Sequence, residues 1–159
     1  MTGDDMTTKQ QPEKSLEVLG DEECLHLLGE GVIGRVGFQA DGVLHVLPVN
    51  FAVDADGTVV FRTSGDGVLA GLAGRQAVFE VDGFDPTSRS GWSVCVRGMG
   101  RDIVAGRFRA VQHLLDLTVI PWAPGERDRW FAITPEEVSG RRIPIVRAAD
   151  FGWIPGVVS

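Results

Sequence analysis

Side chains that could bind a flat, anionic ligand lie close together in the stretch HVLPVNFAVDADGTVVFRTSGDG, residues 45–67. Positions 43–53 are apolar almost throughout. They nevertheless include Pro48, which cannot donate a hydrogen bond within a sheet, and Asn50, whose buried amide needs a partner. This combination indicates a planar ligand lying along the strand. The alternative is that neighbouring backbone groups satisfy the Asn50 side chain.

The end of the same stretch carries residue types that suit a phosphate group. Thr63 and Ser64 offer hydroxyls just before a short helix that we predict over 67–73. Backbone amides at a helix N-terminus can add donors, and the helix dipole strengthens them. Arg62 adds a fixed charge with a two-pronged donor geometry. An ordinary strand-to-helix turn with a helix cap explains the same residues without a ligand.

The elements that must position these residues are mostly short strands separated by Asp-Gly turns, which favour hairpins. Alternating apolar positions predict strands over 32–38, 43–53, 58–63, 76–84, 92–104, 130–134 and 141–146, and helices over 21–29 and 107–117. In the first helix, Leu25, Leu27 and Leu28 form the expected buried stripe, and Gly98 in the long strand suggests a bulge. Six or seven short strands with regular turns favour a closed antiparallel barrel.

Length and composition limit the classes of protein. The 159 residues suit one folded domain, which we place at 15–148 between a disordered tail over 1–14 and a C-terminal tail over 149–159. No signal peptide and no apolar run of about 20 residues is present, so we expect a cytoplasmic protein that does not enter membranes. The formal net charge of −7 argues against nucleic acid as a partner.

The metal-ligating residue types are scattered along the chain. Cys24 and Cys95 lie in different predicted elements, and we expect both to be reduced and structural. His26, His45 and His113 are likewise scattered along the chain. We therefore expect no metal site formed by protein ligands.

Three segments together carry a resemblance to a known family. HVLPVNFAVDADGTVVFRT, EVDGFDPTSRSGWSVCVRGMG and PWAPGERDRWFAITPEEVSGRRI follow one another in the order found in pyridoxamine 5′-phosphate oxidase-like proteins. The chain resembles this family over about residues 18–147. The resemblance implies a mainly β fold, a six- to seven-stranded antiparallel split β-barrel of the type that binds flavin mononucleotide (FMN). It also implies a homodimer with two FMN sites at the interface, each using residues of both subunits.

The family pattern implies a set of site residues in this chain. The backbone of Pro48, Val49, Asn50 and Phe51 would lie along the flavin ring and ribityl chain, and Arg62, Thr63 and Ser64 would face the phosphate. Trp92 and Ser93 would cover the ring or its edge, and Trp122 and Arg127 would come from a late loop. Core packing explains Trp92 as well as stacking does. Members commonly carry a lysine where this chain has Asp66-Gly67-Val68, so Asp66 departs from the pattern.

The resemblance implies a flavin-dependent oxidoreductase acting on a small molecule that we do not identify. No catalytic residue is assigned, because a flavin carries the redox chemistry itself. We do not expect genuine pyridoxamine phosphate oxidation, since the chain has no tyrosine and its tail RAADFGWIPGVVS lacks the family's basic motif. The alternative is a dimer without turnover that stores or senses flavin, a deazaflavin coenzyme or haem.

Overall fold

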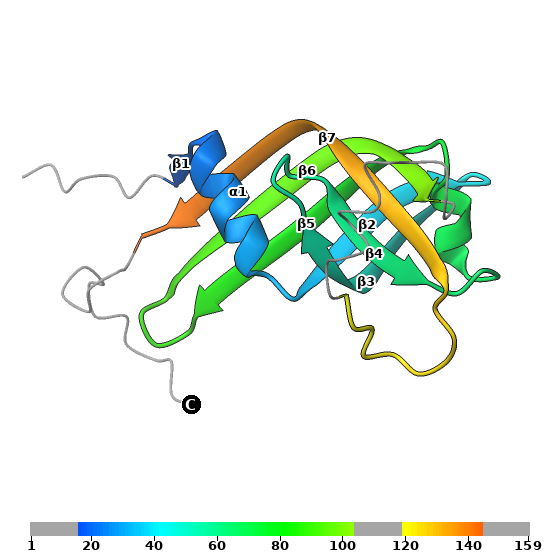
Figure 1. The fold of residues 1–159 in the computed structure, drawn as a ribbon. Coiled ribbons are helices and arrows are strands. Elements are labelled where there is room, and N and C mark those ends of the chain that lie inside the picture. Colours follow the sequence, from blue (N-terminus) through cyan, green and yellow to red (C-terminus); the bar gives the residue numbers. More distant parts are fainter. Residues whose placement is uncertain (1–15, 104–118, 145–159) are drawn as a thin grey trace, which may run out of the picture.

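An antiparallel barrel with one helix packed on it is formed by residues 16–103 and 119–144, the part of the chain that the computed structural model describes (Figure 1). In chain order the elements are β1 (Glu17–Leu19), α1 (Asp21–Glu30), β2 (Ile33–Ala40), β3 (Val43–Val53), β4 (Val59–Thr63), the 3₁₀ helix η1 (Val68–Leu72), β5 (Gln76–Asp85), β6 (Ser90–Ile103) and β7 (Arg129–Ile143).

The sheet closes on itself through its last strand. The strand order is β1-β7-β4-β3-β2-β5-β6, and β6 also pairs with β7, so six antiparallel strands form a ring. β1 is the seventh strand and pairs only with the far end of β7. The predicted fold class, a mainly β antiparallel barrel of six to seven strands, is confirmed.

Asp-Gly turns set the register of the first hairpins, as predicted. Asp41 and Gly42 have φ values of 51° and 79°, the left-handed region that a tight two-residue hairpin requires. In the next turn, Asp54 Oδ1 accepts hydrogen bonds from the backbone amides of Asp56 and Thr58, both at 2.9 Å. These local bonds fix how β2, β3 and β4 pair, and therefore which side chains share a face.

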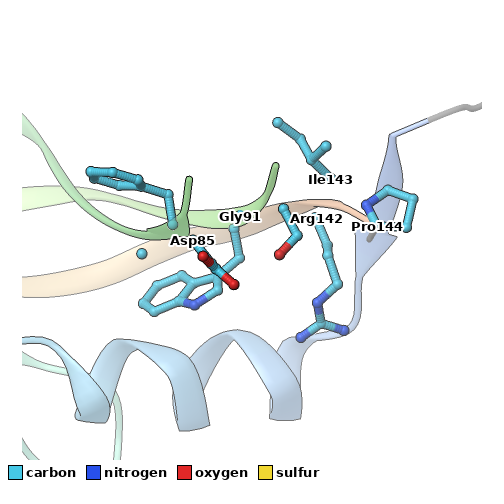
Figure 2. A pocket seen from close by; sticks show the side chains of 9 residues that line it. Asp85, Gly91, Arg142, Ile143 and Pro144 are labelled. Carbon is cyan, nitrogen blue, oxygen red and sulfur yellow. The ribbon is translucent and has the colours of Figure 1, made fainter. Parts of the chain in front are cut away.

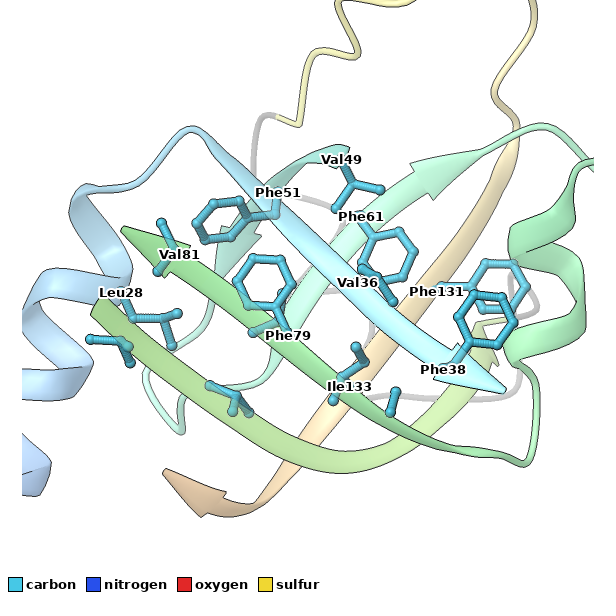
Figure 3. Packing of buried hydrophobic residues seen from close by; sticks show 14 of the residues in the cluster. Leu28, Val36, Phe38, Val49, Phe51, Phe61, Phe79, Val81, Phe131 and Ile133 are labelled. Atoms are coloured by element: carbon cyan, nitrogen blue, oxygen red, sulfur yellow. The ribbon is translucent and has the colours of Figure 1, made fainter. Parts of the chain in front are cut away.

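Alternate residues of each strand fill the barrel interior (Figure 3). Val36, Phe79 and Phe131 are fully buried there, and the Phe51 and Phe79 rings meet edge to face with centroids 4.6 Å apart. α1 adds Cys24, Leu27 and Leu28 to this core, while Leu25, which we expected to be buried, is only partly buried and packs against it. The interior is thus filled by side chains, so any ligand must bind outside it.

The prediction of two strands over 130–134 and 141–146 is wrong, because β7 is one continuous strand of 15 residues. The intervening PEEVSG contains a proline and a glycine and reads as a loop. In the structure, Pro135 lies opposite Gly98 at a bulge, where a missing N–H is tolerated. The two backbones approach so closely that a Cβ on Gly98 would lie 1.9 Å from the Thr134 carbonyl oxygen.

Some predictions fall outside the described residues or were incomplete. The helix expected over 107–117 and the tails over 1–14 and 149–159 lie outside residues 16–103 and 119–144. β1 was not predicted, because three residues are too few to show an alternating pattern. Within the described ranges, no helix is long and apolar enough to cross a bilayer.

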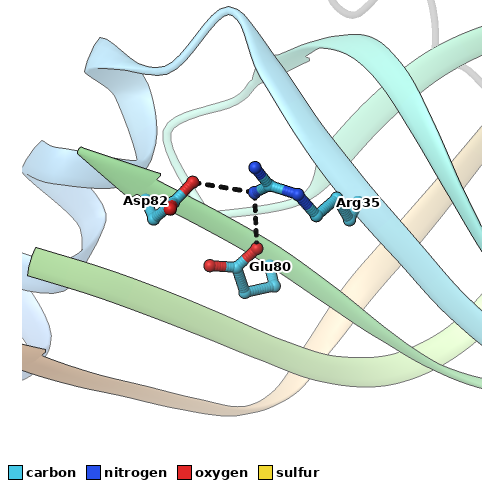
Figure 4. A network of polar contacts seen from close by, with 3 residues as sticks. All are labelled: Arg35, Glu80 and Asp82. Atoms are coloured by element: carbon cyan, nitrogen blue, oxygen red, sulfur yellow. Dashed lines mark hydrogen bonds and ion pairs between the residues drawn. The ribbon is translucent and has the colours of Figure 1, made fainter. Parts of the chain in front are cut away.

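The outer face of the barrel carries charged groups that pair with one another. Arg35 on β2 donates to Glu80 and Asp82 on β5, both at 2.8 Å (Figure 4). The hydrogen bond to Asp82 contributes most to raising the pKa of Arg35, and the hydrogen bond to Glu80 contributes next. Because the Arg35 side chain is 46% exposed, we assign these pairs only a small contribution to stability.

Candidate functional site

The outer face of β3 presents two of the four residues predicted along the ligand. Val49 and Phe51 point into the core and are each 7% exposed, so they can offer a ligand only their backbone. Pro48 and Asn50 point outward. The Phe51–Phe61 pair of β3 and β4 puts Asn50 and Arg62 at the next positions along the two strands, on the same outer face.

The Asn50 amide is satisfied by backbone groups of this chain, which was the alternative to a ligand contact. Its Nδ2 donates to the Val32 carbonyl oxygen at 3.3 Å, and its Oδ1 accepts the backbone N–H of Trp122 at 2.8 Å. An amide has two donors and two lone pairs, so capacity for a further bond of each kind remains. Asn50 therefore ties the late loop to β3 beside the outer face.

The late loop, residues 119–128, brings one of its two predicted residues to β3. The Trp122 side chain is 68% exposed although its backbone is held by Asn50. Arg127 bonds within the loop instead, where its Nε donates to the Ala123 carbonyl oxygen at 3.4 Å. Trp122 is thus available as a cover for the outer face, whereas Arg127 serves the loop's own conformation.

Arg62 is a partly buried cation with one hydrogen-bond donor that has no partner. Its guanidinium lies over the ring of Trp130 on β7, 5.0 Å from the centroid. Its Nε is buried and has no hydrogen-bond partner. Among the described residues, no carboxylate forms an ion pair with it. An anion bound here would satisfy both the charge and the donor.

Two hydroxyls converge on the turn that follows β4. Thr63 is 2% exposed, and a Cβ on Gly67 would lie 2.8 Å from Ser64 Oγ and 3.7 Å from Thr63 Oγ1. The absence of a side chain at Gly67 therefore leaves a small hollow beside both oxygens. Asp66 is exposed on the same turn.

The predicted helix over 67–73 is a 3₁₀ turn of five residues, Val68–Leu72. So short a helix has little dipole, and we withdraw the argument that a helix N-terminus supplies donors to a phosphate. The binding groups that remain are the hydroxyls, the turn amides and Arg62.

Arg129 belongs to this site, and sequence reasoning missed it. It begins β7 opposite Thr63, donates from Nη1 to the Gly65 carbonyl oxygen at 3.0 Å, and pairs through Nη2 with the Asp102 carboxylate. The alternation of Arg129 with Phe131 and Ile133 could have indicated its face. No pattern in the sequence could have indicated its bond to the turn.

Trp92 and Ser93 do not join the other predicted residues within one chain. Trp92 packs partly buried against the core and lines a pocket of about 400 Å³ with Asp85, Arg142 and Pro144 (Figure 2). In the sheet, Trp92 lies opposite Arg142 of β7, whereas Arg62 lies opposite Trp130 of the same strand. Up to about 40 Å of extended strand therefore separates Trp92 from Arg62 along β7. Ser93 is on the opposite face of β6, beside Asp82.

Thiols and metal-ligating groups form no second site in the part of the chain that is described. Burial, followed by the charges of Asp21 and Glu23, raises the pKa of the Cys24 thiol. Burial, followed by the charge of Glu80, raises the pKa of the Cys95 thiol. Both thiols are free, and no group of three or more histidine, cysteine or acidic side chains is arranged to hold a metal ion there.

The closed antiparallel ring with α1 packed on it is a split β-barrel, and comparisons with known proteins give the family. The family model for pyridoxamine 5′-phosphate oxidase matches residues 20–142. The chain belongs to this family. Its relatives include the uncharacterized protein Rv0080 of Mycobacterium tuberculosis, 31% identical over 147 residues that cover 85% of this chain and 91% of that protein.

Two solved structures resemble the fold over nearly their whole length. The FAD-binding protein from Mycobacterium smegmatis superposes with a TM-score of 0.62 and 27% identity, covering 82% of this chain and 100% of that one. A putative pyridoxamine 5′-phosphate oxidase from Corynebacterium glutamicum superposes with a TM-score of 0.67 and 25% identity, covering 83% and 96%.

Proposed function

We propose that this protein binds a flavin on the outer face of β3 and β4, with the flavin phosphate at the turn after β4. The observation that carries the proposal is Arg62, a partly buried cation whose Nε has no hydrogen-bond partner. A buried donor without a partner costs about 1–3 kcal/mol, and a phosphate oxygen would remove that cost. The similarity to a FAD-binding protein supports a flavin as the ligand.

The residues present fit a flavin nucleotide. β3 pairs with β4 only over Phe51–Val53, so the β4-facing backbone edge of residues 48–50 and the remaining capacity of the Asn50 amide can bond the edge of a flat ring. Arg62 and Ser64 provide a charge and a hydroxyl for a phosphate, whereas the Thr63 hydroxyl, in a side chain that is 2% exposed, could reach one only through the hollow at Gly67. The chain's only lysines are Lys9 and Lys14 in the N-terminal tail, so arginine must supply the cation in the barrel.

FMN is the flavin that we propose, and FAD is the competing candidate, because one similar structure is a FAD-binding protein. Haem is less well supported. The ring of His45 packs against Phe38, with centroids 5.3 Å apart, and His26 pairs with Glu30 on the exposed side of α1. Neither of these two histidines is among the residues of the proposed site.

We further propose a flavin-dependent oxidoreductase that acts on a small organic molecule and not on pyridoxamine phosphate itself. When bound, the flavin would supply the electron transfer. The protein's own residues would hold its phosphate, orient its ring and cover it with Trp122. Storage or sensing of the flavin without turnover is the alternative.

A second copy of this chain is the partner that we propose, with the flavin site at the interface. The outer face of β3 carries Leu44 and Val46, 78% and 72% exposed, and continues directly into Pro48 and Asn50. Val78 on β5 extends this apolar patch. A contiguous exposed apolar surface beside a ligand site is typical of an association surface.

The test is a titration of the purified protein, stripped of small molecules, with FMN, FAD and haem. We expect saturable quenching of FMN or FAD fluorescence, an increased melting temperature, and anaerobic bleaching of the flavin band by NADH or NADPH if the protein turns over. A flavin that binds but is not reduced would favour storage or sensing. A protein that neither flavin stabilises, or a Soret band without flavin binding, would refute the proposal.

A further inference from the structure

We propose that Arg129 is a positioning residue that, braced by Asp102, holds the turn Ser64–Gly67 in the form that receives the ligand's phosphate. This inference rests on the flavin proposal above and deepens it. It assigns to Arg129 no contact with the ligand. Arg62 supplies the charge, and Arg129 fixes the backbone beside it.

The contacts of Arg129 are those of a brace between three strands. It stands at the start of β7, opposite Thr63, the last residue of β4. One prong of its guanidinium donates to the Gly65 carbonyl oxygen at 3.0 Å, and the other pairs with Asp102 on β6. Its face lies over the Phe131 ring, 5.4 Å from the centroid. A planar two-pronged cation suits such a bridge, because its donors are fixed relative to one another.

The turn is packed against the same side chain. A Cβ on Gly65 would lie 3.2 Å from Cδ of Arg129, so the turn backbone rests directly on the arginine stem. The Arg129 side chain is 35% exposed and Asp102 is 24% exposed, so this ion pair is more shielded than the other ion pairs of the described residues.

Little else in the turn restrains it. The Gly67 N–H reaches the Ser64 carbonyl oxygen at a long 3.4 Å, and the Gly67 carbonyl oxygen accepts the Ala70 N–H of η1 at 2.9 Å, which anchors only the last residue of the turn. Gly65 and Gly67 flank Asp66, and glycines lose more conformational freedom on ordering than any other residue. A ligand that had to order this turn would therefore bind more weakly, and a brace that orders it beforehand increases affinity.

The charge of Arg129 is already paired with Asp102. A substitution of Asp102 can therefore distinguish a positioning role of Arg129 from electrostatic attraction of the phosphate. If Arg129 acted only through its charge, Asp102→Asn would free that charge and tighten FMN binding. If Arg129 acts as a brace, Asp102→Asn loosens the arginine and weakens FMN binding. The two explanations therefore predict opposite signs for one substitution.

The experiment compares wild type, Arg129→Met, Arg129→Lys and Asp102→Asn, with Arg101→Met as control. Arg101 is the exposed neighbour of Asp102 on β6. Amide hydrogen exchange is measured over residues 64–68 without ligand, and FMN and riboflavin are titrated separately. For Arg129→Met we expect exchange in the turn to be about tenfold faster and FMN binding about tenfold weaker, the loss typical of one hydrogen bond to a charged group.

The affinity of Arg129→Met for riboflavin, which lacks the phosphate, should fall by less than about threefold. Arg101→Met should match wild type in both measurements. Arg129→Lys keeps the stem and the charge but not the fork, so it should fold and bind FMN with intermediate affinity. It also serves if Arg129→Met does not fold.

Each failure has a distinct signature. If wild type binds no flavin, the proposed function fails, while the exchange measurement still decides whether Arg129 orders the turn. Unchanged exchange over 64–68, an equal loss of FMN and riboflavin affinity, or tighter FMN binding by Asp102→Asn would each overturn the brace.

Discussion

In the ligand-free protein, Arg62 has a buried donor that lacks a hydrogen-bond partner. Its Nε is buried without a partner, which opposes folding by about 1–3 kcal/mol. Its stacking on Trp130 works in the opposite direction, since cation–π contacts contribute about 0.5–2 kcal/mol. The flavin proposal accounts for this unpartnered donor, because a phosphate oxygen would accept its hydrogen bond.

Replacement of Arg62 by methionine should therefore separate stability from binding. We expect the melting temperature of the ligand-free protein to stay the same or rise, because the unpaired donor is gone. FMN affinity should fall at least about tenfold, as one charge-assisted contact is lost. Differential scanning fluorimetry and an FMN titration measure the two effects.

The matched control is Arg75→Met, which removes a surface arginine that pairs with Asp41 at 3.7 Å, away from the turn. It should change neither quantity. A lower melting temperature of the Arg62 variant together with unchanged FMN affinity would show that Arg62 is structural.

The two thiols should control stability at high pH, because no other common group of the barrel titrates there. The chain has no tyrosine, and both lysines precede residue 15. Burial raises the pKa of Cys24 and of Cys95 above the ordinary value of 9.0. The unfolded thiols therefore ionise first, so stability is complete below about pH 9 and is lost as pH rises toward the folded pKa values.

We expect the free energy of unfolding to fall by up to about 1.4 kcal/mol per pH unit for each thiol in that window. Urea denaturation at pH 8, 9 and 10 measures this slope. Cys24→Ala should make the slope shallower even though it lowers stability at pH 8. An identical slope in the variant would exclude Cys24 as the titrating group.

At the scale of elements, the sequence was most informative where structure is local. The Asp-Gly turns and the alternation of β2 to β6 predicted the first five strands of the ring to within two residues at each end. β7 was divided wrongly because Pro135 looks like a break. It is tolerated only since Gly98, on another strand, lets the two backbones meet closely.

The site shows the same limit. Asn50, Arg62, Thr63 and Ser64 were predicted as ligand residues, and this stays a prediction. The role proposed for Arg129 depends on Gly65 and Asp102, which are 64 and 27 positions away along the chain. Such a contact is defined by strand pairing and cannot be read from local sequence.

The bulge between β6 and β7 makes a sharp prediction about stability. A methyl group at Gly98 would overlap the Thr134 carbonyl oxygen, so Gly98→Ala should destabilise by about 1–3 kcal/mol or more. Gly29→Ala is the matched control, because Gly29 lies in α1 with nothing within 4 Å of an added Cβ. It should stabilise by about 0.5–1 kcal/mol.

Urea denaturation of both variants measures the difference. Equal stability of Gly98→Ala and wild type would mean that β6 and β7 can separate at Pro135, and that the continuous strand is not required.

At the scale of the whole molecule, the apolar patch of Leu44, Val46 and Val78 is the surface that the dimer proposal needs. Burial of apolar area contributes roughly 25 cal/mol per Å², so a charge within the patch should prevent association. We expect Leu44→Asp to be monomeric by light scattering while retaining the β-rich circular dichroism spectrum of wild type.

The same variant should bind FMN more weakly if the site is completed by the second copy. Phe84→Ser is the control, since Phe84 is also 78% exposed but lies in the hairpin of β5 and β6. It should remain dimeric. A wild-type protein that is monomeric at all concentrations, or a monomeric Leu44→Asp with full FMN affinity, would argue against a site shared between subunits.

The continuous β7 has a consequence for the order in which parts of the protein can fold during synthesis. It is the last strand of the ring, and it pairs with β6, with β4 and with β1, the first strand of the described residues. A nascent chain that lacks residues 129–143 therefore exposes the unpaired edges of β4 and β6, which invite association with other chains. Ring closure, the pairing of β1 and the bond from Arg129 to the turn after β4 all require this one late segment, so the proposed ligand site and the closed barrel should form in the same step of folding.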